Sequence, residues 1–221
     1  MEFNNQNHFK MKRIFTLLFI IVASISIYGQ SNTRHLAFPQ FVQGVVYFKD
    51  GGRLESLLNY SLIWDKMLFM ENGEVMQVNN ADKISHALLG GQVFIPVGDV
   101  FYQVIREGDD GLYFQYHGKL IPAGSPSLYG TTSQTSGALS LAEIGVVATK
   151  LEMPAQYKVQ VENQYLWYRN GKYTPFTTVK EICNAFPGHE KEIKTFIKEK
   201  KIRLRSHQEY LDVLDFCISI R

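Results

Sequence analysis

Cysteine is scarce in this chain of 221 residues, which holds only Cys183 and Cys217. Two cysteines are too few for a disulfide scaffold, and they form no C-x-x-C pair of the kind that binds zinc. Both lie late in the chain among apolar residues. The sequence therefore leaves two alternatives: a pair of core thiols, or a Cys183–Cys217 disulfide formed in an oxidising compartment.

Motifs for catalysis and cofactor binding are also missing. No G-x-S-x-G elbow occurs, and the five histidines that follow residue 30 share no H-x-x-x-H spacing. The glycine pairs Gly51-Gly52 and Gly90-Gly91 stand between expected strands and precede no helix, unlike a phosphate loop. We therefore expect no metal, no cofactor and no enzymatic activity.

Long apolar runs are limited to one, Ile14 to Ile27, which follows the basic residues Lys10, Lys12 and Arg13. This layout is typical of a secretory signal peptide, and the run falls short of the roughly 20 residues that a membrane span needs. We expect residues 1–29 to be removed, with Met11 as the true start and Gln30 as the mature N-terminus. The mature chain would then be exported, to the periplasm or the cell surface, and would have no transmembrane segment.

Excess charge is lacking once that segment is removed. It takes three of the 23 basic residues and one of the 21 acidic residues, so residues 30–221 carry no net charge. A nucleic-acid-binding protein usually shows a clustered basic surface, so we expect no nucleic-acid partner.

Alternating apolar and polar residues dominate residues 30–176, and turn residues such as Asn72-Gly73 and Asn170-Gly171 separate the runs. The pattern predicts a mainly β domain: an antiparallel meander, barrel-like or a sandwich, without the intervening helices of a parallel sheet. Expected strands cover residues 43–49, 53–60, 63–70, 74–78, 84–89, 92–97, 100–106, 112–117, 157–162, 164–169 and 172–176.

A segment rich in Gly, Ser, Thr and Pro, residues 122–140, interrupts this pattern. A composition with so few large apolar groups predicts a long flexible loop, and a functional loop is the alternative.

Residues 177–221 predict three amphipathic helices that cap the sheet, giving an α+β chain overall. Thr178 with Glu181, and Ser206 with Glu209, have the spacing of a capping box at a helix start. Lys191, Lys194 and Lys198 fall outside the apolar stripe of the second helix, where a solvated face is the simplest interpretation.

Aromatic residues are the enriched class, and the expected strand 164–169 alternates them. Tyr165 and Trp167 share one face, and Leu166 and Tyr168 share the other. If one face is exposed, Tyr165 and Trp167, with Tyr129 from the long loop, are candidates for binding a sugar or a peptide partner. The alternative is that both faces are buried.

Six stretches of the chain together form a pattern: the Gly-Gln end of the signal segment, Gly44 to Gly51, Leu58 to Tyr60, Tyr129 to Ser133, Phe186-Pro187 and Ile193 to Lys198. In these stretches the chain resembles secreted, uncharacterised proteins of Bacteroidetes-type bacteria. The resemblance implies export into a Gram-negative envelope. It implies no activity and no site residues.

Three functions are compatible with these observations. The leading expectation is a non-enzymatic envelope or periplasmic protein that binds a protein partner or a ligand. The second is a glycan- or small-ligand-binding module that uses strand aromatics, and the third is a hydrolase whose scattered residues converge in space.

Overall fold

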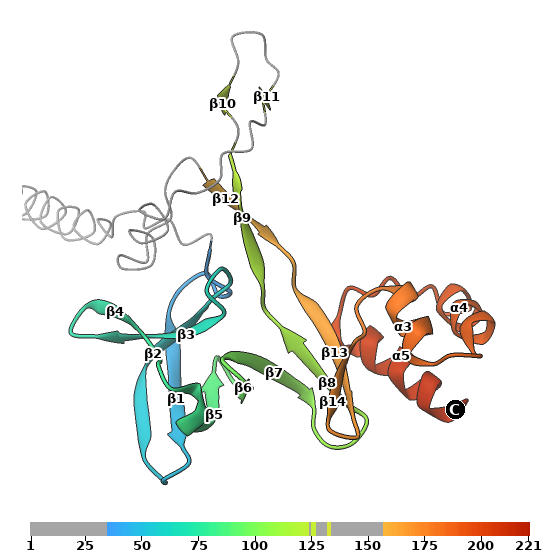
Figure 1. The fold of residues 1–221 in the computed structure, drawn as a ribbon, viewed down its shortest axis with the longest axis horizontal. Helices are drawn as coiled ribbons and strands as arrows, with labels where there is room; N and C mark the ends of the chain where they lie inside the picture. Colours follow the sequence, from blue (N-terminus) through green and yellow to red (C-terminus); the bar gives the residue numbers. More distant parts are fainter. Residues whose placement is uncertain (1–34, 124, 127–131, 134–156) are drawn as a thin grey trace, which may run out of the picture. The chain divides into compact units, whose positions relative to one another are not determined.

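Ten antiparallel strands form the main sheet of the computed structural model, and three helices follow it (Figure 1). The structure describes residues 35–123, 125–126, 132–133 and 157–221, all within one compact unit, Thr33–Arg221. The mainly β, α+β fold that the sequence predicts is confirmed. The expected signal peptide, Tyr129 and most of the 122–140 loop lie outside the described residues.

The strands of the main sheet lie in the order β14-β13-β8-β7-β6-β5-β1-β2-β3-β4. Their bounds are β1 Val42–Phe48, β2 Arg53–Ser61, β3 Lys66–Glu71, β4 Glu74–Gln77, β5 Ile84–Leu89, β6 Gln92–Val97, β7 Val100–Arg106, β8 Gly111–Gln115, β13 Gln164–Arg169 and β14 Lys172–Pro175.

The strand order departs from a simple meander at β5. This strand does not continue from β4 but pairs with β1, on the side opposite β2. The short 3-10 helix η2, Ala81–Lys83, precedes β5 and buries Ala81. The β3–β4 hairpin turns on Asn72 and Gly73, whose φ angles of 51° and 84° suit the two-residue turn that the sequence predicts.

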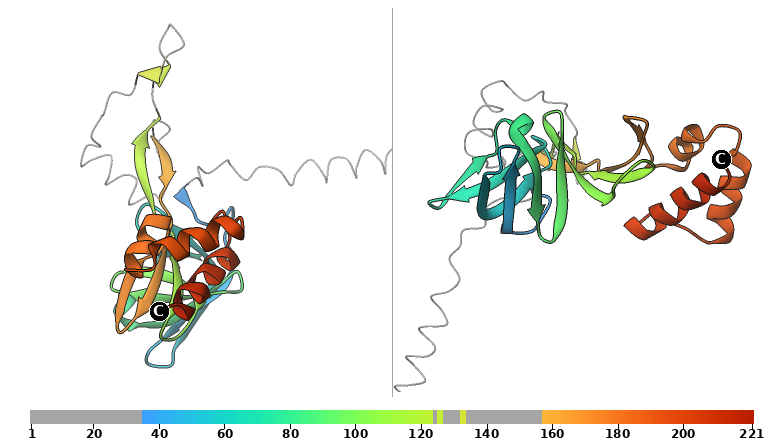
Figure 2. Two further views of the ribbon diagram at one scale, coloured as in Figure 1. Left: turned by 90° about the vertical axis from the view of Figure 1, so that its right-hand side faces the viewer. Right: turned by 90° about the horizontal axis from the view of Figure 1, so that it is seen from below.

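The first part of the sheet curls so that β3 approaches β7 (Figure 2). The Lys66 ammonium donates to the Asp99 carbonyl at 3.2 Å, and the Phe101 N–H donates to the Tyr60 hydroxyl at 3.4 Å. The curl encloses a first core of apolar residues from six strands: Val46, Leu58, Tyr60, Met67, Ile84, Ala87, Leu89, Phe94 and Phe101.

The buried Asn59 fastens the N-terminal arm to β2. Its amide donates to the carbonyls of Phe38 and Gln40 at 3.0 and 3.1 Å, and its oxygen accepts from the N–H groups of Phe38 and Tyr60. All four hydrogen-bonding positions of the side chain are used, which a buried amide requires. The arm is therefore part of the fold.

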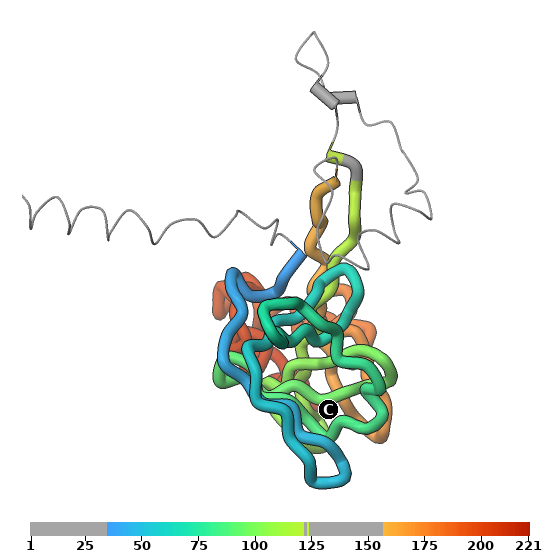
Figure 3. The backbone as a smooth tube through the Cα atoms, turned by 90° about the vertical axis from the view of Figure 1, so that its left-hand side faces the viewer, coloured from blue at the N-terminus to red at the C-terminus, as the bar shows by residue number. Residues whose placement is uncertain are grey.

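Strands β9 (Gly118–Pro122) and β12 (Tyr157–Val161) form a two-stranded ribbon that the sequence pattern predicts only in part, because β9 is not expected (Figure 3). The ribbon extends the paired strands β8 and β13. Its base is tight, because a Cβ at Gly118 would lie 2.7 Å from the Val159 side chain. The strands β10 (Ser125–Pro126) and β11 (Thr132–Ser133) pair to form a further short ribbon.

Three helices, α3 (Val179–Ala185), α4 (Glu190–Glu199) and α5 (His207–Ser219), complete the chain as the sequence predicts. Both expected capping boxes are present, at Thr178 and Ser206. The helices share a second core with β8, β13 and the segment after β14, formed by Leu112, Tyr165, Trp167, Phe176, Ile182, Cys183, Phe186, Ile193, Tyr210, Val213, Leu214 and Cys217.

Candidate functional site

Tyr165 and Trp167, the strand aromatics that the sequence nominates for binding, lie beneath the helices. They are only 7% and 8% exposed. The Tyr165 ring stacks on Tyr210 at 3.5 Å between centroids, and the Trp167 ring stacks on Phe186 at 4.5 Å. The expected platform required exposure of this face, so neither side chain is available to a ligand there.

Four other tyrosines lie on the opposite face of β13 and of the strands beside it. Tyr102 on β7, Tyr113 on β8, Tyr168 on β13 and Tyr173 on β14 lie on one face, which we call the tyrosine face. The register shows this. Tyr168 is directly opposite Tyr173, while Tyr113 is directly opposite both Leu166 and Val104. Leu166 is two residues from Tyr168, and Val104 is two residues from Tyr102, so each of these pairs shares a face. The three helices pack against the other face.

The four rings come from four strands, and the ring of Tyr173 contacts the other three. Tyr173 lies 5.1 Å from Tyr102, 5.2 Å from Tyr113 and 4.8 Å from Tyr168, between ring centroids. Most of these contacts are edge-on or tilted, which suits the quadrupoles of aromatic rings. Tyr113 is buried beneath its neighbours, whereas Tyr102, Tyr168 and Tyr173 are partly exposed.

Burial raises the pKa of three hydroxyls on this face, those of Tyr102, Tyr113 and Tyr173. Partial burial, together with the charges that the neighbouring tyrosines would carry, raises the pKa of Tyr173 to about 12. Burial also raises the pKa of Tyr102 and of Tyr113 above the usual value. The hydroxyls of Tyr102, Tyr113 and Tyr173 are therefore neutral at physiological pH and are available as both donors and acceptors.

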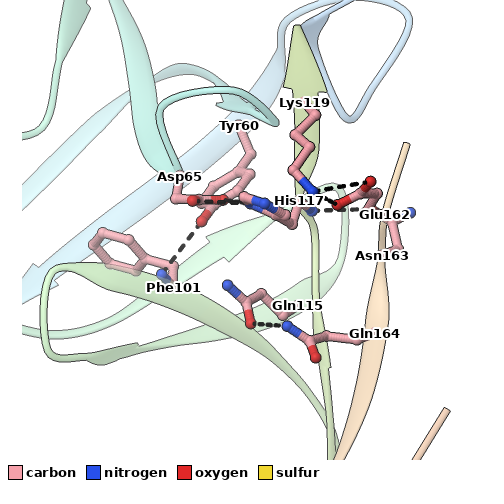
Figure 4. Close-up of polar contacts among 9 residues, drawn as sticks. All are labelled: Tyr60, Asp65, Phe101, Gln115, His117, Lys119, Glu162, Asn163 and Gln164. Atoms are coloured by element: carbon pink, nitrogen blue, oxygen red, sulfur yellow. Dashed lines mark hydrogen bonds and ion pairs between the residues drawn. The ribbon is translucent and has the colours of Figure 1, made fainter. Parts of the chain in front are cut away.

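Two glutamines extend the tyrosine face toward the base of the ribbon. The Gln164 amide donates to the Gln115 carbonyl oxygen at 2.9 Å, and Gln115 lies directly opposite Tyr102 (Figure 4). This bond uses one N–H of Gln164 and the carbonyl oxygen of Gln115. The Gln164 carbonyl oxygen and the Gln115 amino group stay free for further hydrogen bonds.

A hydrogen-bonded pair, Asp65 and His117, follows the glutamines (Figure 4). Asp65 sits in the turn between β2 and β3 with a φ of 52°, and its carboxylate oxygens lie 3.0 Å from His117 Nδ1. Burial raises the pKa of the Asp65 carboxyl, and the hydrogen bond from His117 opposes that rise. The Asn163 side chain accepts the His117 backbone N–H at 3.0 Å, so His117 is held by Asp65 at its ring and by Asn163 at its backbone.

The acidic group near the Asp65–His117 pair already has partners of its own. The nearby Glu162 carboxylate is engaged by Lys119 at 3.1 Å and by Gln160 at 3.0 Å. Within the described ranges, no three or more His, Cys, Asp or Glu side chains gather as metal ligands. What the arrangement offers is aromatic stacking and uncharged hydrogen bonding.

The other expected site residues have separate positions. Cys183 and Cys217 are free, buried thiols in the core beneath the helices, so the structure has the pair of core thiols rather than the disulfide. Burial raises the pKa of Cys217 to about 12 and also raises that of Cys183, which keeps both protonated and unreactive. Tyr129 lies outside the described residues. None of the helices that the structure describes is long and apolar enough to cross a membrane.

Alternation alone could have indicated the tyrosine face, because Tyr168 and Tyr173 flank the Asn170-Gly171 turn symmetrically and so pair across it. The partnership of β13 with β8 could not be seen, since 48 residues separate Gln115 from Gln164. Comparison of the chain with protein-family models, curated proteins and solved structures finds no match.

Proposed function

We propose that this protein is an exported, non-enzymatic binding protein that holds a neutral glycan on its tyrosine face. The observation that carries the proposal is the set of four contacting tyrosines on the sheet face opposite the helices. Aromatic rings of this kind stack on the apolar faces of sugar rings, and their hydroxyls bond sugar hydroxyls.

The polar groups beside the tyrosines support a neutral ligand. Gln115 and Gln164 offer amide donors and acceptors, and the Asp65 carboxylate is already paired with His117. A charged ligand would find no unpaired opposite charge among these residues. The signal-like segment at residues 14–27 supports export to the periplasm or cell surface, where glycans are available.

Binding of neutral oligosaccharides by residues 30–221, followed by tyrosine fluorescence or calorimetry, tests the proposal. We expect Tyr168→Ala and Tyr173→Ala to weaken binding at least about tenfold each, as loss of a central aromatic contact does. The matched control is Tyr47→Ala, which removes a partly exposed tyrosine stacked on His86 in another part of the sheet.

Equal binding by the Tyr47 and Tyr173 variants would contradict the proposed site. Failure of all neutral oligosaccharides, together with recovery of a protein partner whose binding depends on Tyr168 and Tyr173, would replace the glycan with a protein ligand on the same face.

A further inference from the structure

A row of lysines follows one side of α4 and continues beyond its end. Lys191, Lys194 and Lys198 stand at i, i+3 and i+7, so they fall within about 60° of one another around the helix axis. All three are exposed, and so are Lys200 and Lys201, which follow the helix. We call these five residues the lysine row.

The fold fixes the direction of the lysine row. Ile193 is buried in the core beneath the helices, and Phe196 and Ile197 pack against that core, so the apolar stripe of α4 faces inward. The lysines lie on the far side of the helix from this stripe, as its period requires. They cannot turn inward without exposing the apolar stripe.

The lysine row outnumbers the acidic residues beside it. Its five lysines stand among Glu190, Glu192 and Glu199, and backbone hydrogen bonds, together with the charge of Lys194, lower the pKa of Glu190. None of its members forms an ion pair with another residue that the structure describes, whereas exposed cations elsewhere do, as in the Arg53–Glu55 and Lys119–Glu162 pairs. Glu192 contacts His189 at 2.9 Å, and the Glu190 carboxylate accepts the Gly188 N–H at 3.1 Å. Within residues 30–221, which are neutral in total, this surface is therefore locally positive.

Two further exposed cations lie in the connection before α5. Arg203 and Arg205 are exposed there, and their backbone N–H groups donate to the Glu209 carboxylate at 3.0 and 2.7 Å. Ile202 and Leu204, which alternate with them, pack against the helical core. Hydrogen bonds to its backbone and packing of its apolar side chains therefore fix this connection. The two arginine side chains remain exposed.

We infer that the lysine row is a docking surface for an anionic phospholipid bilayer. Clusters of four to eight Lys and Arg residues bind such surfaces through charge, at about fivefold in affinity for each residue. Single-stranded nucleic acid is a poorer match, because its binding surfaces interleave cations with stacking aromatics and the row contains none. The bilayer contact is electrostatic and peripheral, since the apolar stripe of α4 is already buried.

Co-sedimentation of residues 30–221 with lipid vesicles tests this surface independently of glycan binding. We expect binding to vesicles of phosphatidylcholine mixed with phosphatidylglycerol, little binding to phosphatidylcholine alone, and loss of binding in high salt. The variant K191Q/K194Q/K198Q/K201Q should bind at least about tenfold more weakly. The control K49Q/K83Q/K158Q/K172Q removes the same charge from exposed lysines elsewhere and should bind almost as well as the unmodified protein.

Both variants keep the core residues, and their thermal unfolding is measured alongside to confirm that they fold. Equal weakening by the two variants, or no preference for anionic vesicles, would overturn the inference. Tighter binding to single-stranded DNA or to dextran sulfate than to the vesicles would overturn it in favour of another polyanion.

Discussion

The two faces of β7, β8, β13 and β14 are both aromatic but are used differently. One face presents Phe114, Tyr165 and Trp167 to the helices and is sealed by them. The other presents the four tyrosines, three of which stay partly exposed. Aromatic content alone therefore does not distinguish a core face from a binding face.

The hydrogen bonding of the tyrosine hydroxyls distinguishes the two faces more clearly. Beneath the helices, each tyrosine hydroxyl has a defined partner: Tyr165 bonds His207 Nδ1 at 2.7 Å, and Tyr210 donates to the Thr177 carbonyl at 2.9 Å. On the tyrosine face, the rings contact one another and no described side chain or backbone group hydrogen-bonds the hydroxyls of Tyr168 and Tyr173. Unbonded hydroxyls beside exposed rings are what a sugar ligand needs.

The largest expected effect comes from the sealed face. Trp167→Ala removes a buried ring stacked on Phe186 and its Nε1 donation to Asp110 at 3.1 Å. We expect a loss of about 3–5 kcal/mol in the free energy of unfolding, measured by urea denaturation. Tyr173→Ala, the matched change on the tyrosine face, should cost about 1 kcal/mol or less. Equal losses would show that the two faces are equally buried.

A smaller loss is expected where the tyrosine face is most crowded. A Cβ at Gly111 would point to this face, 2.9 Å from the Tyr113 ring and 2.7 Å from the Gly108 carbonyl oxygen. Gly111→Ala should therefore shift Tyr113 and cost about 1–3 kcal/mol in urea denaturation, with weaker glycan binding. Gly52→Ala is the control, because its nearest contact is the flexible Asp50 side chain at 3.1 Å. If Gly111→Ala changes neither the free energy of unfolding nor glycan binding, the space around Gly111 is not as crowded as described.

Acid should lower the free energy of unfolding through His207, which contacts Tyr165 on the sealed face. Burial lowers the pKa of His207 below its usual 6.5, so the unfolded chain binds more protons than the folded one in the interval between the two values. Stability from this residue is complete above pH 6.5 and is lost as the pH falls toward the folded pKa. We expect a decrease below about 1 kcal/mol, because partial exposure screens the charge.

The measurement for His207 is urea denaturation at a series of pH values for the unmodified protein and for His207→Gln, which cannot titrate there. His189→Gln is the control, since that histidine is paired with Glu192 at the surface. If the pH dependence stays the same in His207→Gln, the histidine beside Tyr165 is not its source.

The smallest expected effect on stability is that of Tyr173→Phe, within about 0.5 kcal/mol, because it removes a partly exposed hydroxyl and keeps the ring contacts. In an alkaline titration followed by ultraviolet absorbance, the variant should lose one tyrosine that ionises with a pKa of about 12. A lost component near pH 10 would mean that the four rings do not shield one another.

The sequence predicts local structure well in this chain. Four strands, residues 84–89, 92–97, 100–106 and 164–169, have the expected bounds, because each is a largely apolar or alternating run next to turn formers. Both capping boxes are found where Thr178 and Ser206 place them, because a cap depends on neighbours three residues away.

Long-range arrangement could not be predicted in the same way. The pairing of β5 with β1 and of β13 with β8 joins distant segments, and no local signal specifies it. The exposed face of β13 depends on where α3–α5 pack, and both faces of that strand are aromatic. The sequence therefore locates the strand of interest correctly, but the nomination of Tyr165 and Trp167 falls on the face that the helices cover.

Hydroxyl-radical footprinting of residues 30–221, read by mass spectrometry with and without a bound oligosaccharide, tests the central claim most directly. The account predicts that Tyr168 and Tyr173 react faster than Tyr165 and Trp167 in the free protein, and that the oligosaccharide slows only the first pair. Faster oxidation of Tyr165 and Trp167, or protection of these two by the ligand, would contradict it.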